Sequence, residues 1–184
     1  MAMATAQRMS VEEFLALPED GKRHELLAGE HIVSPTPRVI HQRAVFALSR
    51  RLWTVVERRP DVELFGVPGD LRLGPADVVE PDLFLVPSGP GPRPQDWRDV
   101  PTPILVAEVL SPSTASWDRG YKRGLYLEAG VEEYWIVDLD ARVVERWRHG
   151  DTRPEICDAE LRFTFANGVA GSIGLPEYFA EVWR

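Results

Sequence analysis

The sequence predicts an α/β fold in which a central mixed β-sheet is flanked by helices. Short apolar strands alternate with stretches of helical periodicity, and the most apolar of them, DLFLV (82–86) and ILVAEVL (104–110), are typical of strands buried at the centre of a sheet. The chain has 184 residues, 44% of them hydrophobic and 27% charged, and neither a repeat nor a domain boundary divides it. We therefore expect a single domain over residues 1–184.

Three signals place the first elements. Ser10 and Glu13 form a capping-box pattern ahead of a short apolar helix that ends at Pro18. Ala28-Gly29 separates two alternating stretches and favours a hairpin turn. Apolar residues that recur every three or four positions then predict a long helix. The elements expected here are the helix before Pro18, strands at 23–27 and 31–34, and the helix at 39–58.

Turn residues and apolar runs place the remaining elements. Pro68-Gly69 separates two short strands, and SGPGPRP (88–94) is a loop that resembles a linker. Gly130 ends a helical stretch, and a later alternation of apolar and charged residues indicates an outer strand. The elements expected here are strands at 62–67, 70–73, 82–86 and 104–110, a helix at 113–129, strands at 131–137, 142–148 and 162–165, and a helix from Pro176.

Composition restricts the classes of function. The net charge of −8 argues against broad electrostatic attachment to nucleic acid, although a local basic strip is compatible with an enzyme that acts on DNA. The single cysteine, Cys157, excludes an intramolecular disulfide framework and a cysteine-rich zinc site. The longest stretch without charged residues, 163–176, is too short for a membrane span, and the first ten residues lack the apolar core of a secretory signal. We expect a cytoplasmic protein with no membrane partner.

Two carboxylates stand in apolar strands. Asp82 follows Pro81 at the start of one strand, and Glu108 lies inside the next. A buried charge is costly unless it is paired or bound to metal, and two adjacent carboxylates repel each other unless a hard cation such as Mg²⁺ lies between them. The alternative is structural, with each carboxylate capped by an arginine or placed at an exposed edge.

A lysine follows on the next helix. Asp118, Lys122 and Tyr126 are spaced by four residues and share one helix face. Lys122 is either part of a surface ion pair or close enough to the two carboxylates to orient and help deprotonate a water, or to stabilise a pentavalent phosphate.

These segments carry a family resemblance. PDLFLV (81–86), AEVLSPST (107–114) and DRGYKRGLYLEAGVEEYWIVD (118–138), with HELLAGEHIVSPTP (24–37) upstream, resemble the Uma-type (DUF820-like) restriction endonuclease family of the PD-(D/E)XK nuclease superfamily. The resemblance implies a restriction-endonuclease-like core and an endonuclease that hydrolyses DNA phosphodiester bonds with Mg²⁺ or Mn²⁺ and expels the 3′ oxygen. By analogy it also implies a homodimer.

The resemblance assigns roles to matching positions. Asp82 and Glu108 would be metal ligands, and the backbone carbonyl of Val109 would add a third contact. The superfamily places a lysine two residues beyond the glutamate, where this chain has Leu110. Lys122 would then act as a migrated catalytic lysine that reaches back from the helix.

Two further positions match the family upstream. Glu25 resembles the acidic residue that the superfamily adds near or at a second metal, and the alternative is a strand-edge charge paired with Arg23 or Lys22. His41, at the start of the long helix, matches a family histidine that would approach the site, whereas a lone histidine there is otherwise an exposed or capping residue. Three more matching residues are interpreted as strand and core features: Glu133, Trp135 and Asp138.

The long helix is basic, because the helix and the residues beside it contain six arginines and one acidic residue, Glu57. These arginines either follow DNA phosphates or form a solvated face. Six tryptophans show no spacing that suits base stacking and are expected in the core or at an interface.

Three functions remain open. The first is the metal-dependent endonuclease. The second is a catalytically inactive binding or scaffold protein with the nuclease fold, which the net charge and Leu110 favour. The third is an acidic α/β domain of an operon partner in which Asp82 and Glu108 are only structural.

Overall fold

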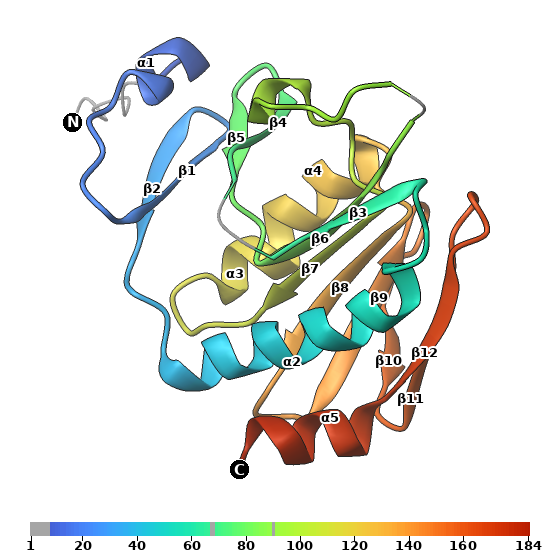
Figure 1. The fold of residues 1–184 in the computed structure, drawn as a ribbon. Coiled ribbons are helices and arrows are strands. Elements are labelled where there is room, and N and C mark those ends of the chain that lie inside the picture. The colour runs from blue at the N-terminus through green and yellow to red at the C-terminus, as the bar shows by residue number, and fades with distance from the viewer. Residues whose placement is uncertain (1–7, 67–68, 90) are drawn as a thin grey trace.

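The computed structural model describes residues 8–66, 69–89 and 91–184. Its elements in chain order are α1 (Val11–Leu15), β1 (Arg23–Leu27), β2 (Glu30–Ser34), α2 (Val39–Val56), β3 (Val62–Phe65), β4 (Leu71–Gly74), β5 (Asp77–Val79), β6 (Leu83–Pro87), η1 (Trp97–Asp99), β7 (Leu105–Val109), α3 (Ala115–Trp117), η2 (Asp118–Lys122), α4 (Arg123–Glu128), β8 (Glu133–Asp138), β9 (Val143–Arg148), β10 (Glu155–Cys157), β11 (Glu160–Thr164), β12 (Ala170–Gly174) and α5 (Leu175–Val182) (Figure 1). The expected strand end at Val67, the turn residue Pro68, the loop residue Pro90 and the first seven residues lie outside the described residues.

A six-stranded mixed sheet forms the centre of the molecule, in the order β10-β9-β8-β7-β6-β3. β7 and β8 run parallel, because the helical segment α3 to α4 carries the chain back across the sheet, and every other neighbouring pair is antiparallel. All five residues of β7 are buried, as expected for the apolar run that predicted it. The predicted α/β fold class is confirmed.

Alternate residues of each central strand pack against different layers. Leu85, Ala107 and Trp135 face the side that α2 and α5 cover. Phe84 and Val106 face the opposite side, which is covered by α4 and by a second sheet that contains β1, β4 and β5. Figure 1 shows α2 and α5 next to each other along one side of the sheet, with α4 on the other. The sheet is therefore flanked by helices on both faces, as the sequence predicted.

A four-stranded sheet, β2-β1-β5-β4, and a two-stranded hairpin, β11-β12, accompany the central sheet. The sequence did not reveal β5, β10 or β12, because two of them have only three residues and the third contains two glycines. The predicted hairpin turn is present between β1 and β2, where Ala28 and Gly29 both have the positive φ that a two-residue hairpin loop requires (51° and 77°).

The helix expected at 113–129 is interrupted by a π-helical turn. An α-helical turn at 115–117 passes into the π-helical segment Asp118–Lys122 and then into α4. Gly130, with φ of +98°, ends the helix as predicted. π-Helical turns occur often at functional sites, and this one contains both Asp118 and Lys122.

The helix predicted from Val39 to Arg58 is confirmed as α2, which ends two residues earlier. Over the described stretches of the chain, no helix combines the length and the apolarity that a membrane crossing requires.

Candidate active site

The antiparallel pairing of β6 with β7 brings the two predicted carboxylates together. Leu83 is the register partner of Ala107, so Asp82, just before β6, lies opposite Glu108 near the end of β7. The backbone N–H of Asp82 donates to Oε2 of Glu108 at 3.3 Å. Both side chains are buried: Glu108 is 2% exposed and the Asp82 side chain 7%. The exposed-edge alternative was therefore wrong.

Three donors surround the Asp82 carboxylate. Nη1 of Arg23 lies 2.8 Å from Oδ1, and the backbone N–H of Val109 donates to Oδ2 at 2.8 Å. Nε2 of His41 lies 3.0 Å from the same Oδ2. Burial alone would raise the pKa of Asp82, but the hydrogen bond with His41 and the charge of Arg23 lower this pKa to about 2. Asp82 is thus held as a carboxylate.

Glu108 is held by a different set of donors. Its Oε1 lies 2.5 Å from Nζ of Lys122 and accepts a hydrogen bond from the Tyr126 hydroxyl at 2.9 Å. Its Oε2 lies 3.5 Å from Nη2 of Arg23. Burial raises the pKa of Glu108 to about 7, because desolvation and the nearby Asp82 charge outweigh the attraction of Lys122. Glu108 therefore ionises less readily than Asp82.

Lys122 lies at the centre of three carboxylates and is 1% exposed. Besides Glu108, its Nζ lies 3.0 Å from Oε1 of Glu25 and 3.4 Å from Oδ1 of Asp118. Burial would lower the pKa of Lys122, yet the three carboxylates raise it well above its ordinary value. The surface ion-pair alternative was wrong, and the ammonium group stays charged.

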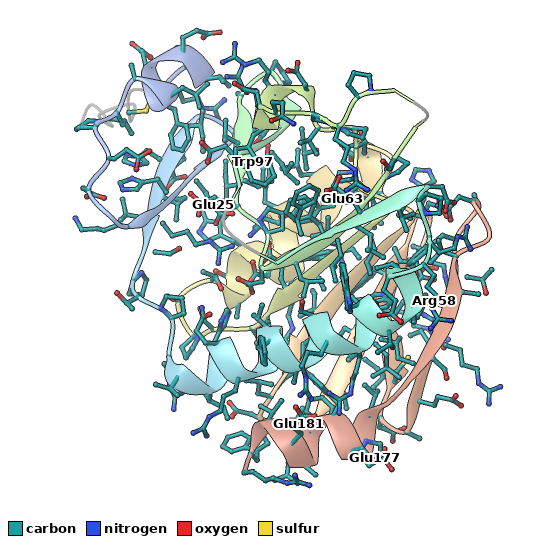
Figure 2. The ribbon with its side chains drawn as sticks, in the orientation of Figure 1. Glu25, Arg58, Glu63, Trp97, Glu177 and Glu181 are labelled. Carbon is teal, nitrogen blue, oxygen red and sulfur yellow. The ribbon has the colours of Figure 1, made fainter. Side chains whose placement is uncertain are left out.

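Glu25 lies on β1, behind Lys122. Its side chain accepts a hydrogen bond from the Glu80 backbone N–H at 3.1 Å and lies 3.9 Å from Nη2 of Arg23. Figure 2 shows Glu25 beside the β1–β2 hairpin, within the molecule. Lys22, the other alternative partner, instead pairs with Asp20 at 2.8 Å on the surface. Glu25 thus holds Lys122 in place and does not line the cavity described below.

His41 is buried in the first turn of α2 and contacts Asp82, so the alternative of an exposed or capping histidine was wrong. Burial opposes the charged imidazolium, but the hydrogen bond with Asp82 and the charge of that carboxylate raise the pKa of His41. Val109 enters the site through its backbone N–H, and the metal contact expected from its carbonyl stays a prediction.

Arg23 is the principal site residue that the sequence did not identify. Its guanidinium contacts both Asp82 and Glu108, and its Nη2 also donates to the backbone carbonyl of Glu80. Arg23 and Glu25 are two positions apart on β1, so their side chains point to the same face of the strand. This spacing was the available signal, because a residue that shares a face with a site carboxylate is a candidate for the same site.

One cavity of about 260 Å³ lies at this site. Ser111, Ser113 and Thr114, which follow β7, line this cavity, and the Ser111 hydroxyl lies 2.9 Å from each of the other two hydroxyls. The segment 34–38, which leads into α2, also lines it. The residues that line the cavity and bear charge or an imidazole are Arg23, Arg38, His41, Asp82, Glu108, Asp118 and Lys122.

The donor chemistry suits a hard divalent cation. The site contains four buried carboxylates and three basic side chains. The carboxylates are Glu25, Asp82, Glu108 and Asp118, and the basic side chains are Arg23, Lys122 and His41. Two neighbouring carboxylates completed by water and phosphate oxygens are a usual Mg²⁺ arrangement. In the part of the chain that the structure describes, no group of three or more His, Cys, Asp or Glu side chains is arranged to hold a metal ion. A cation at Asp82 and Glu108 would depend on water and substrate for its other ligands.

The basic character of α2 is partly neutralised. Arg50 and Arg51 lie 2.6 Å and 2.8 Å from the Glu181 carboxylate of α5, and Figure 2 shows Glu181 between the two helices. Arg38 lines the cavity instead. Of the tryptophans, Trp135 lies in the core and Trp53 is exposed on α2.

Comparisons with known proteins agree with this architecture. A solved structure described as a putative nuclease belonging to DUF820, from Anabaena variabilis ATCC 29413, superposes with a TM-score of 0.81 at 20% identity, covering 95% of this chain and 99% of that one. An uncharacterized protein of Synechocystis sp. (strain ATCC 27184 / PCC 6803 / Kazusa), sll1609, is 29% identical over an alignment of 176 residues that covers 90% of this chain and 98% of that protein. The model of the Uma2 family, described as "Putative restriction endonuclease", matches residues 11–176. The chain therefore belongs to the Uma2 family, with the nuclease-like fold that the sequence motifs predicted.

Proposed function

We propose that this protein is an endonuclease that hydrolyses DNA phosphodiester bonds with Mg²⁺ or Mn²⁺. The observation that carries the proposal is the convergence of Asp82, Glu108 and Lys122 on one cavity. The three residues come from three different segments of the chain. A purely structural role does not require all three to border the same cavity. The family and the related nuclease fold support the same class of reaction.

Asp82 and Glu108 would hold the cation, with the Val109 carbonyl as an additional contact. When bound, the cation would polarise the scissile phosphate and offset the charge that develops on its oxygens. The pKa of Asp82, lowered to about 2, keeps this residue ionised over the whole physiological range. Cavity hydroxyls and Arg38 would position the substrate phosphate by hydrogen bonding and charge.

Lys122 acts as a cation in this proposal. Because its pKa is raised well above the ordinary value, it cannot accept a proton from water and instead donates hydrogen bonds. It would orient the attacking water and stabilise the phosphate as the water oxygen bonds to phosphorus. As the bond from phosphorus to the 3′ oxygen breaks, the attacking water loses one proton to the surrounding solvent and the 3′ oxygen takes one up from it, which leaves a 3′ hydroxyl and a 5′ phosphate. Glu25 would be a positioning residue that acts through Lys122.

The test begins with metal binding, which needs no knowledge of the DNA substrate. Mn²⁺ is titrated by calorimetry into the metal-free protein and into the Asp82→Asn and Glu108→Gln variants. We expect at least about tenfold weaker binding in each variant, because each loses one of two anionic ligands. Supercoiled plasmid is then incubated with each protein and Mg²⁺ or Mn²⁺, and we expect nicking by the parent alone.

Matched controls come from partly exposed carboxylates outside the cavity. Asp61 pairs with Arg59 at 2.7 Å and Glu63 pairs with Arg93 at 2.7 Å. Asp61→Asn and Glu63→Gln should bind Mn²⁺ and nick DNA as the parent does. The proposal fails if the site variants cut DNA as well as the parent and the controls do.

A second candidate is the catalytically inactive binding or scaffold protein. The specific observation in its favour is that Arg23 already compensates both carboxylates, as it would in a site with no cation. This candidate expects DNA or protein association that is indifferent to divalent metal, and it expects Asp82→Asn to destabilise the fold without changing Mn²⁺ binding. Homodimer formation is a separate proposal, which sedimentation of the purified protein tests.

A further inference from the structure

The guanidinium of Arg23 occupies the space between the two proposed metal ligands. Nη1 lies 2.8 Å from Oδ1 of Asp82, and Nη2 lies 3.5 Å from Oε2 of Glu108. A cation that bridges these carboxylates would need the same oxygens and the same space.

The remaining donors of the site cannot make room for a cation. The second oxygen of Asp82 is held by the Val109 backbone N–H, which the sheet fixes, and by His41. The second oxygen of Glu108 is held by Lys122, which is fixed in turn by other buried carboxylates. Arg23 is the one donor among the described residues that contacts both ligands, and its side chain is 18% exposed at the cavity wall.

Arg23 also has other partners close by. Its guanidinium lies 3.9 Å from Oε1 of Glu25 and 3.9 Å from Oε2 of Glu80. Nη2 donates to the Glu80 backbone carbonyl as well. A small rotation of the side chain would therefore keep the charge compensated after the guanidinium leaves Asp82 and Glu108.

We propose that Arg23 is an internal counter-cation that competes with the divalent metal for Asp82 and Glu108. In the metal-free protein it neutralises the repulsion between the two carboxylates, and metal binding requires it to shift toward Glu80 and Glu25. Its competition makes the apparent metal affinity equal to the intrinsic affinity multiplied by the fraction of molecules in which the guanidinium has already moved away. This inference rests on the proposed metal site and adds a residue that sets the affinity of that site.

The test compares Mn²⁺ affinities by calorimetry in the parent, Arg23→Gln and Arg23→Lys. Arg23→Gln keeps much of the side-chain length without the charge and should bind Mn²⁺ at least about tenfold more tightly than the parent. Arg23→Lys keeps the charge but cannot bridge two carboxylates with a planar fork, so its affinity should fall between the two. The double variant Arg23→Gln/Asp82→Asn should lose the gain, which assigns the binding to this site.

A matched control removes a buried arginine elsewhere. Arg146 is more deeply buried than Arg23, pairs with Glu155 and Glu133, and does not line the cavity. Arg146→Gln should leave Mn²⁺ affinity unchanged even if it lowers stability. Circular dichroism with and without Mn²⁺ checks folding, and a Mn²⁺-dependent recovery of structure in Arg23→Gln would itself support the competition.

The outcomes separate this inference from the proposed function. If the parent binds Mn²⁺ through Asp82 while Arg23→Gln binds equally or more weakly, Arg23 does not compete, although the metal site stands. If Arg23→Gln binds and the parent does not, the inference is supported in its strongest form. If neither protein binds Mn²⁺, both the inference and the metal dependence are overturned.

Discussion

Replacing Lys122 by methionine is expected to destabilise the protein severely, because the change leaves three buried carboxylates without their shared cation. The lysine is 1% exposed, and its Nζ lies 2.5 Å, 3.0 Å and 3.4 Å from Glu108, Glu25 and Asp118. Removing one partner of a buried ion pair costs about 3–5 kcal/mol, since the charge left behind remains desolvated. For a domain of this size that loss corresponds to a fall in Tm of about 6–20 °C.

The loss should depend on pH in a direction that the site defines. Burial raises the pKa of Glu108 to about 7 even with Lys122 present, and without it the pKa should rise further. A carboxyl group whose folded pKa is raised contributes stability that is complete below the unfolded pKa of about 4.3 and is lost as the pH rises through the folded pKa. The variant should therefore be closer to the parent at about pH 5 than at about pH 8.

Urea unfolding followed by circular dichroism in chelated buffer measures both effects. The chain supplies a matched control, because Lys22 is the only other lysine and pairs with Asp20 on the surface. Lys22→Met should unfold at the urea concentration of the parent at either pH. The reasoning is refuted if Lys122→Met loses less than about 1 kcal/mol, the upper end of what an exposed pair contributes.

Two further predictions concern packing and ionisation. A β-carbon on Gly171 would lie 2.8 Å from side-chain atoms of both Phe163 and Val55, whereas one on Gly124 in α4 meets no described atom within 4 Å. In urea unfolding, Gly171→Ala should lose about 1–3 kcal/mol and Gly124→Ala should gain about 0.5–1 kcal/mol, and equal effects would contradict the packing. Burial raises the pKa of the buried Tyr126, Tyr134 and Tyr178 well above the ordinary value. Desolvation and the hydrogen bond to Asp77 raise the pKa of the more exposed Tyr121 to about 12. The near-ultraviolet absorbance of phenolate should therefore stay low in the folded protein at about pH 10, where a free tyrosine is half ionised, and half ionisation of Tyr126, Tyr134 or Tyr178 there would contradict their burial.

Local patterns were sufficient for most of the large sheet. β6, β7 and β8 are apolar runs bounded by turn residues. In the four-stranded sheet, Ala28-Gly29 indicated the β1–β2 hairpin, because glycine readily takes the positive φ that such a loop uses. β5 was not predictable, because three residues show no periodicity and their pairing with β1 depends on a distant part of the chain. Nothing in residues 113–129 indicated the π-helical turn. The spacing of apolar residues predicts a helix but does not show which backbone groups hydrogen-bond within it.

The convergence of the site was predictable in part. Strand position and helix spacing selected Asp82, Glu108 and Lys122, the family motifs added Glu25 and His41, and the structure brings all five into one hydrogen-bonded cluster. Burial of Lys122 and His41 was not predictable, because spacing shows which residues share a face and not what covers that face. Arg23 was missed for the same reason, since its role depends on the side of β1 that meets the start of β6.

The two buried cations should differ in whether a metal can replace them. Arg23 contacts the oxygens of Asp82 and Glu108 that a divalent cation would bind. When Arg23 is replaced, added Mn²⁺ can therefore supply the positive charge that the substitution removes. Lys122 also compensates Glu25 and Asp118, and Glu25 does not line the cavity that the proposed metal ligands border. Mn²⁺ should therefore restore the thermal stability of Arg23→Gln more completely than that of Lys122→Met. Equal recovery of the two variants in a metal titration of Tm would mean that the cation binds among all the carboxylates and not between Asp82 and Glu108.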